Sequence, residues 1–191
     1  MLKQYVIAIG GSAGSLFALR KFFDHTPLNN ASYVILRHLP LDYKSALNNI
    51  LKQHSKLKVE EAKRGASIQN DCVYYASPGN HLIIEDGSLE FVSRVKESRN
   101  RQIDIFLESL ARNENKRKSI AIILSGTGTD GVKGAAAIKK AGGTVIVQTP
   151  DSCEFPDLPS EVIKSGNADF IVPPEGMPAV IKRCLVESPV S

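Results

Sequence analysis

No apolar stretch in this sequence approaches the roughly 20 residues that a helix needs to cross a bilayer, so we expect no direct membrane insertion. An apolar run begins at residue 5, and we expect no signal peptide before it. The three cysteines, Cys72, Cys153 and Cys184, are odd in number and share no metal-ligand spacing. We therefore expect reduced thiols, no metal, no cofactor and a cytoplasmic location, with Cys72 and Cys184 on apolar faces.

The excess of positive over negative charge is also small, with a formal net charge of only +4. The basic residues are scattered, and the run Lys116-Arg117-Lys118 lies in a predicted polar connection without aromatic residues to stack on bases. We therefore expect no nucleic-acid partner. Repeats and low-complexity tracts are absent, and 191 residues with 42% hydrophobic content fit one domain, 1–191, with a full core.

Apolar periodicity predicts alternating strands and helices. Leu16, Leu19 and Phe23 share one helical face, and Asp42 is a candidate N-cap for a second helix. Strands are predicted at 5–9, 33–36, 57–59, 120–124, 144–147 and 170–172, and helices at 15–25, 43–54, 103–110, 132–141, 160–164 and after Pro173-Pro174. This order predicts a doubly wound three-layer α/β/α sandwich with a mostly parallel sheet.

Between residues 72 and 92 the apolar period changes to two. Residues 72–76 are apolar, Pro78-Gly79-Asn80 predicts a turn, and the runs 82–85 and 89–92 flank Asp86-Gly87. An Asp-Gly pair between apolar runs is a strong hairpin signal. We therefore predict that this whole section is an antiparallel insertion into the α/β pattern.

Three predicted strands end in short polar or glycine-rich loops that carry Ser12, His38 and Asp130. If the three strands are parallel members of one sheet, these residues meet at its carboxyl edge, where open α/β sheets bind ligands. A serine, a histidine and a carboxylate together constitute the machinery of acyl transfer.

The loop around Ser12 fits G-x-S-x-G, with a strand before it and a helix after it. Such a turn exposes the hydroxyl, and the N–H of Ala13 is the first candidate donor to an oxyanion. The alternative is a glycine-rich turn that only allows the helix to pack closely against the strand.

The other two candidates also have structural alternatives. His38 is either a general base or a structural or solvent-facing histidine, and His25, His54 and His81 are weaker candidates for the base. Asp130 either orients the ring of His38 or is an ordinary N-cap of the helix that follows it, and both roles are compatible.

The same segment supports a rival hypothesis. Gly126, Gly128 and Gly131 fit the G-x-G-x-x-G pattern of dinucleotide-binding loops, and Asp151 lies twenty residues beyond the last glycine. Against this reading, Asp130 would bring a carboxylate into the loop that holds a pyrophosphate, and like charges repel at close range. The rival also leaves Ser12 and His38 without a role.

With these loops, the chain resembles the catalytic domain of the chemotaxis receptor protein-glutamate methylesterases, the CheB family, over residues of about 4–182. The loops at 10–15, 38–40 and 125–131 resemble the family patterns G-A-S-x-G-G, H-[ML]-[PD] and [TS]-G-x-G-x-D-G. The segments 75–81 and 155–159 resemble two further family stretches, A-P-G-x-x-H and F-x-[GD]-[ML]-P.

The resemblance implies a serine hydrolase that removes methyl groups from γ-glutamyl methyl esters of chemotaxis receptors, releases methanol and is able to deamidate receptor glutamines. It implies Ser12 as nucleophile, His38 as base and Asp130 as orienting acid. Positioning of the oxyanion and substrate is expected from four further residues: Ala13, Thr127, Gly128 and Arg37.

Several residues in and beside these loops differ from those that relatives often carry. Ser15 replaces a glycine and is expected to crowd the first loop, whereas Arg37, often glutamine in relatives, brings a cation beside the base. Ala13 stands where many relatives have threonine, and Thr127 replaces a frequent methionine. These departures leave open a catalytically inactive module that docks on receptors or senses a ligand.

Many family members carry a receiver domain ahead of this one, and we expect none within these 191 residues. The resemblance also includes a branch fused to a receptor methyltransferase. A fused or separate methyltransferase or receiver domain is therefore an expected partner, alongside the methyl-accepting receptors as protein substrate.

Overall fold

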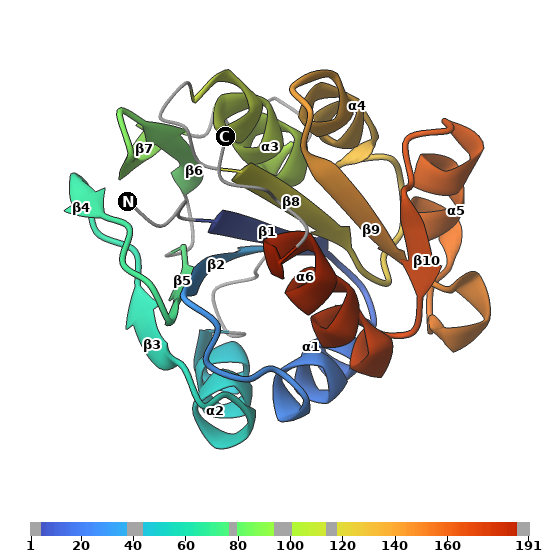
Figure 1. Ribbon diagram of the computed structural model, residues 1–191, viewed down its shortest axis with the longest axis horizontal. Helices are drawn as coiled ribbons and strands as arrows, with labels where there is room; N and C mark the ends of the chain where they lie inside the picture. The colour runs from blue at the N-terminus through green and yellow to red at the C-terminus, as the bar shows by residue number, and fades with distance from the viewer. Residues whose placement is uncertain (1–4, 38–43, 77–79, 94–100, 114–117, 187–191) are drawn as a thin grey trace.

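The computed structural model describes residues 5–37, 44–76, 80–93, 101–113 and 118–186. It has three layers, in which a central sheet is covered by helices on both faces (Figure 1). The sheet has seven strands in the order β10-β9-β8-β1-β2-β5-β3, and its neighbouring strands all pair in parallel. Its strands are β1 (Tyr5–Gly11), β2 (Ala31–Arg37), β3 (Lys58–Glu61), β5 (Cys72–Tyr75), β8 (Lys118–Ile123), β9 (Thr144–Gln148) and β10 (Phe170–Val172). The predicted doubly wound α/β sandwich is confirmed.

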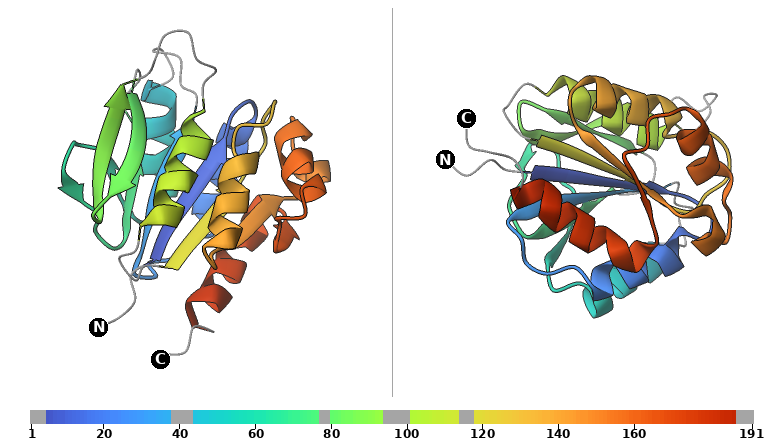
Figure 2. Two further views of the ribbon diagram at one scale, coloured as in Figure 1. Left: turned by 90° about the horizontal axis from the view of Figure 1, so that it is seen from above. Right: turned by 45° about the vertical axis from the view of Figure 1, so that its right-hand side comes forward.

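The helices divide between the two faces of the sheet, as the views in Figures 1 and 2 show. One face carries α1 (Ser15–Asp24), α2 (Lys44–His54) and α6 (Met177–Val186), and the other carries α3 (Gln102–Arg112), α4 (Val132–Lys140) and α5 (Asp157–Lys164). Each predicted helix is present, with ends shifted by a few residues. The candidate N-cap Asp42 lies outside the described residues.

One strand of the section predicted to be antiparallel belongs elsewhere. Strand β5 pairs in parallel with both β2 and β3 and is a member of the central sheet, so the antiparallel prediction was wrong for it. Its four residues are all buried. A strand buried on both faces reads as a continuous apolar run, and such a run does not reveal the direction of its partners.

The hairpin prediction itself is confirmed. Strands β6 (Asn80–Glu85) and β7 (Ser88–Ser93) pair antiparallel around Asp86 and Gly87, whose φ angles are 47° and 79°. Positive φ at both central residues is what a type I′ turn requires. The hairpin and β4 (Ala66–Ser67), which was not predicted, form a separate three-stranded sheet beside α3 (Figure 2).

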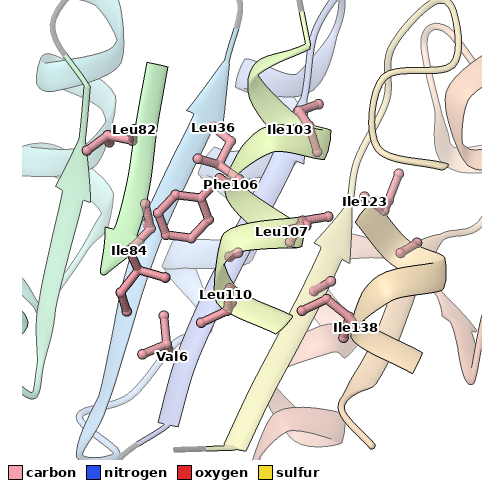
Figure 3. Packing of buried hydrophobic residues seen from close by; sticks show 14 of the residues in the cluster. Val6, Leu36, Leu82, Ile84, Ile103, Phe106, Leu107, Leu110, Ile123 and Ile138 are labelled. Carbon is pink, nitrogen blue, oxygen red and sulfur yellow. The ribbon is translucent and has the colours of Figure 1, made fainter. Parts of the chain in front are cut away.

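Two hydrophobic clusters lie on opposite faces of the central sheet. On the α3 side, the ring of Phe106 packs among apolar side chains of the hairpin and of β2 (Figure 3). Ser109 Oγ accepts a hydrogen bond of 3.0 Å from the Ile84 N–H, which ties the hairpin to α3. On the other side, Phe22, Phe23 and Tyr33 meet edge to face. The small sheet therefore shares a core with the main sheet.

The three cysteines are free thiols. Cys72 is buried, and Cys184 is partly buried against the cluster on the α6 side, as the apolar pattern predicted. Burial raises the pKa of the Cys153 thiol to about 11.

The direction in which the chain leaves each strand determines where a ligand crevice opens. The chain leaves β1 toward α1 on one face and leaves β8 toward α4 on the other. The two strands are neighbours in the sheet, with Gly10 paired to Ile123. Their following loops diverge, and in open α/β sheets such a switch point is where the crevice forms.

Candidate active site

Ser12 lies at this switch point, in the turn between β1 and α1. Its N–H donates to the Ser125 carbonyl at 3.0 Å, which joins the loop after β1 to the loop after β8. A methyl group on Gly126 would lie 2.5 Å from Ser12 Oγ. Gly14 has φ 72°, and a side chain there would lie 2.7 Å from Glu154 Cβ and Ser125 Oγ. Gly126 therefore leaves the space in which the Ser12 hydroxyl sits, and Gly14 leaves room for Glu154 and Ser125 beside the loop.

The hydroxyl of Ser12 accepts a hydrogen bond of 3.1 Å from the backbone N–H of Thr127. Among the described residues, none accepts a hydrogen bond from the N–H of Ala13. Gly128, with φ 80°, has open space where a side chain would project. The structure thus brings together Ser12, Ala13 and Thr127, with Gly128 at the open side of the same loop.

Arg37 ends β2 opposite Gly11, and its Nη2 donates to the Ser12 carbonyl at 3.1 Å. Ser15 does not crowd the turn, contrary to the expectation, because its hydroxyl donates to the same carbonyl at 2.7 Å. Gly11 provides the room, since a methyl group on it would lie 2.7 Å from Ser15 Cβ. Both departures from the family patterns contact the backbone of the proposed nucleophile.

Asp130 faces the start of α3. Its two carboxylate oxygens accept hydrogen bonds from the N–H groups of Ile103 and Asp104, at 3.0 and 2.9 Å. The N-cap of the following helix, α4, is Gly131, which has no side chain to cap it, and the N–H groups of Gly131 and Gly134 donate to Asp104 rather than to Asp130. The interpretation of Asp130 as an ordinary N-cap of its own helix was therefore wrong, because it caps a helix 27 residues earlier in the chain.

Asp104 completes a reciprocal arrangement that sequence reasoning missed. Its Oδ1 accepts from the N–H groups of Gly131 and Gly134 at 2.9 and 2.8 Å. The first turn of α3 is therefore capped by Asp130 from the loop before α4, and the start of α4 is capped by Asp104 from α3. Burial raises the pKa of the Asp104 carboxyl, and the neighbouring charge of Asp130 adds to this rise. Hydrogen bonds from the two glycines and the charge of Arg101 oppose it.

Ser125 is a second residue that was missed. Its hydroxyl lies 2.9 Å from the Ala13 carbonyl and accepts a 3.0 Å hydrogen bond from the Phe155 N–H. Gly126 exchanges backbone hydrogen bonds with the same segment, 155–159, through Phe155 and Leu158. The sequence held a signal for Ser125, because this residue opens the third family pattern and 155–159 resembles a further one. The sequence did not reveal that the Ser125 hydroxyl joins the two segments, because its backbone partners depend on the fold.

His38 lies outside the described residues, so its position relative to Ser12 and Asp130 stays a prediction. The other histidines have structural partners. His81 is buried beside the Gln102 amide at 3.1 Å, His54 contacts Asp24 at 2.7 Å, and the ring of His25 contacts the Lys21 carbonyl at 2.9 Å.

In the part of the chain that the structure describes, no group of three or more His, Cys, Asp or Glu side chains is arranged to hold a metal ion. Within the same residues, no helix has the length and apolar character to cross a membrane.

A serine on a strand–turn–helix elbow, at the carboxyl edge of an open parallel sheet, is typical of α/β serine hydrolases. Comparison with known proteins narrows this class. The model of the CheB methylesterase family matches residues 7–181, and the chain belongs to that family.

The chain is 31% identical, over 93% of its length, to protein-glutamate methylesterase/protein-glutamine glutaminase 5 of Myxococcus xanthus. It is 32% identical, over 91% of its length, to the Thermotoga maritima protein-glutamate methylesterase/protein-glutamine glutaminase. It covers 53% and 52% of these two proteins, so the chain spans about half the length of the curated relatives it matches.

Solved structures include the CheB methylesterase catalytic domain of Thermotoga maritima, which is 31% identical to this chain. The TM-score is 0.85, with 95% of this chain and 99% of that domain covered. The similarity therefore extends over the whole of that catalytic domain.

Proposed function

We propose that this chain is a serine esterase that hydrolyses γ-glutamyl methyl esters on the cytoplasmic helices of chemotaxis receptors. The observation that carries the proposal is the Ser12 hydroxyl, held 3.1 Å from the Thr127 N–H at the point where β1 and β8 diverge. The family match and the names of the relatives, protein-glutamate methylesterase/protein-glutamine glutaminase, support a protein-bound glutamyl methyl ester as the substrate class.

In the proposed reaction, Ser12 Oγ attacks the ester carbonyl while His38 takes its proton. The N–H groups of Ala13 and Thr127 stabilise the oxyanion, methanol leaves with a proton from His38, and water then hydrolyses the acyl-enzyme. Asp130 orients His38 and stabilises its charged form. Each turnover restores one glutamate charge on the receptor, which can shift its signalling equilibrium. The same triad would release ammonia from receptor glutamines.

The test is methanol release from methylated receptor membranes. Ser12→Ala should lower the rate by at least about 1,000-fold, as loss of a triad serine does. Ser165→Ala is the matched control, because its hydroxyl donates to a backbone carbonyl at the far end of α5. No release by the wild-type chain, with its fold verified, would contradict the proposal and favour an inactive receptor-docking module.

The pH profile tests the proposed base. Activity should fall as the pH drops through about 6.5, the unperturbed pKa of histidine, because only neutral His38 accepts the serine proton. A flat profile from about pH 5 to pH 8, with chemistry rate-limiting, would contradict His38 as the base.

A further inference from the structure

The backbone carbonyl of Ser12 collects hydrogen bonds from two residues on different elements. The Ser15 hydroxyl donates to it at 2.7 Å, the Ser15 N–H at 3.3 Å and Arg37 Nη2 at 3.1 Å. Ser15 is fully buried at the start of α1, and Arg37 ends β2. A charged donor and a buried hydroxyl therefore hold one peptide oxygen in place.

This oxygen belongs to the peptide unit that carries the Ala13 N–H. A peptide unit is planar, and in the trans form its C=O and N–H point in opposite directions. The described chain contains no cis peptide bond. Since Ser15 and Arg37 fix the direction of the Ser12 carbonyl, they also fix the direction of the Ala13 N–H, which points away from them.

The neighbouring peptide units are held by a different residue. The Ser125 carbonyl accepts from the Ser12 N–H at 3.0 Å, and the Ser125 hydroxyl lies 2.9 Å from the Ala13 carbonyl. These contacts fix the peptide units before and after the one that carries the Ala13 N–H. The orientation of the middle unit rests on Ser15 and Arg37.

We propose that Ser15 and Arg37 are positioning residues that aim the Ala13 N–H at the developing oxyanion, a role that rests on the proposed esterase function. Preorganised donors lower the barrier because they need no reorientation when charge develops on the carbonyl oxygen. The guanidinium has a second effect. A charged donor on the carbonyl polarises the peptide, and hydrogen bonds in a chain strengthen one another.

The experiment compares two substrates that differ only at the oxyanion atom. One is a receptor peptide with a γ-glutamyl methyl ester, and the other is its methyl thionoester, in which sulfur replaces the carbonyl oxygen. Sulfur is a weaker hydrogen-bond acceptor than oxygen. A donor aimed at the oxyanion therefore accelerates the oxygen ester more than the sulfur analogue. The readout is the ratio of the two kcat values.

Ser15→Ala and Arg37→Met remove one donor each. For each variant we expect kcat on the oxygen ester to fall by about 10- to 100-fold, less than the loss on deleting an oxyanion donor itself. KM should change by less than about twofold, because the interaction matters mainly in the transition state. The kcat ratio of oxygen to sulfur ester should fall at least about fivefold. The fold-loss of kcat in the double variant should be smaller than the product of the two single fold-losses, because the two donors share one acceptor.

Ser165→Ala is the control, and its rates and ratio should equal those of the wild type. Equal losses on both substrates, or no loss, would overturn the proposal, because a merely structural role does not distinguish oxygen from sulfur. If Arg37→Met does not fold, the small change Ser15→Ala decides the question by the same ratio. A wild-type chain that hydrolyses neither ester would overturn the proposed function, and this inference with it.

Discussion

At the scale of single residues, the site depends on positions that carry no side chain. Gly126, Gly11 and Gly14 each lie where a methyl group would approach the Ser12 loop or its neighbours to between 2.5 and 2.7 Å. Of these, only Gly126 would crowd the proposed nucleophile oxygen itself. The reactivity of Ser12 should therefore be more sensitive to this glycine than the stability of the fold is.

Gly126→Ala should lower ester hydrolysis by at least about 100-fold. The added methyl group lies 2.5 Å from Ser12 Oγ and 3.1 Å from Ser12 N, so the serine must leave its position. A misplacement of about 1 Å can cost this much in rate. Overpacking should lower the free energy of unfolding by about 1–3 kcal/mol, measured by urea denaturation.

The matched control for this substitution is Gly176→Ala. The nearest atom to the added methyl group there is 3.8 Å away, which is ordinary contact, so rate and stability should match the wild type. Full activity of Gly126→Ala would show that the Ser12 hydroxyl is not the reacting group in this position.

At the scale of elements, α3 and α4 exchange carboxylates. Asp130, in the loop before α4, accepts from the first N–H groups of α3, and Asp104, in the first turn of α3, accepts from Gly131 and Gly134. Negative charge is favourable at a helix N-terminus. The loop that carries Asp130 is thus anchored to both helices, which holds the proposed orienting acid in place.

Asp130→Ala should destabilise the fold as well as impair catalysis. It removes the acceptor for two N–H groups of α3, and loss of a helix cap costs about 1–2 kcal/mol. Urea denaturation should show this loss, whereas Ser12→Ala should leave the free energy of unfolding almost unchanged. Equal stability of the two variants would contradict a capping role.

Asp104→Asn should change how stability depends on pH. Because the pKa of Asp104 is raised in the folded state, the folded protein takes up this proton at a higher pH than the unfolded chain does. The stability of the wild type relative to Asp104→Asn should therefore increase as the pH falls from 7 toward the unfolded value of about 3.9. Urea denaturation at several pH values measures this difference, and parallel curves would contradict it.

At the scale of the whole molecule, one core joins the small sheet to the large one. Phe106 of α3 is fully buried and lies between hairpin residues such as Leu82 and strand residues such as Leu36 (Figure 3). The same helix receives the Asp130 carboxylate at its first turn. We therefore expect the hairpin and the proposed site to unfold together as one cooperative unit.

Phe106→Ala should lower the free energy of unfolding by about 3–5 kcal/mol, the usual cost of deleting a buried aromatic ring. Circular dichroism during urea unfolding should still show a single transition. Phe17→Ala is the control, since Phe17 is 57% exposed on α1 and its loss should cost less than about 0.5 kcal/mol. Two separate transitions in Phe106→Ala would show that the small sheet folds independently.

The sequence by itself determined the layered α/β fold, the hairpin at Asp86-Gly87 and the loop that carries Ser12. These features depend on contacts between residues close in the chain, and periodicity and turn chemistry report such contacts directly. The strand-end loops also singled out His38, which lies outside the described residues, and Asp130, and the family resemblance added Thr127.

Only the tertiary structure decided which distant segments meet. Strand β5 lies parallel to β2 and β3, and Asp130 caps α3 rather than its own helix. Ser15 and Arg37, which the sequence presents as departures, converge on the Ser12 carbonyl. The physical reason is that strand direction, helix caps and backbone acceptors are satisfied by whichever group the fold brings near, and nothing local in the sequence records that neighbour.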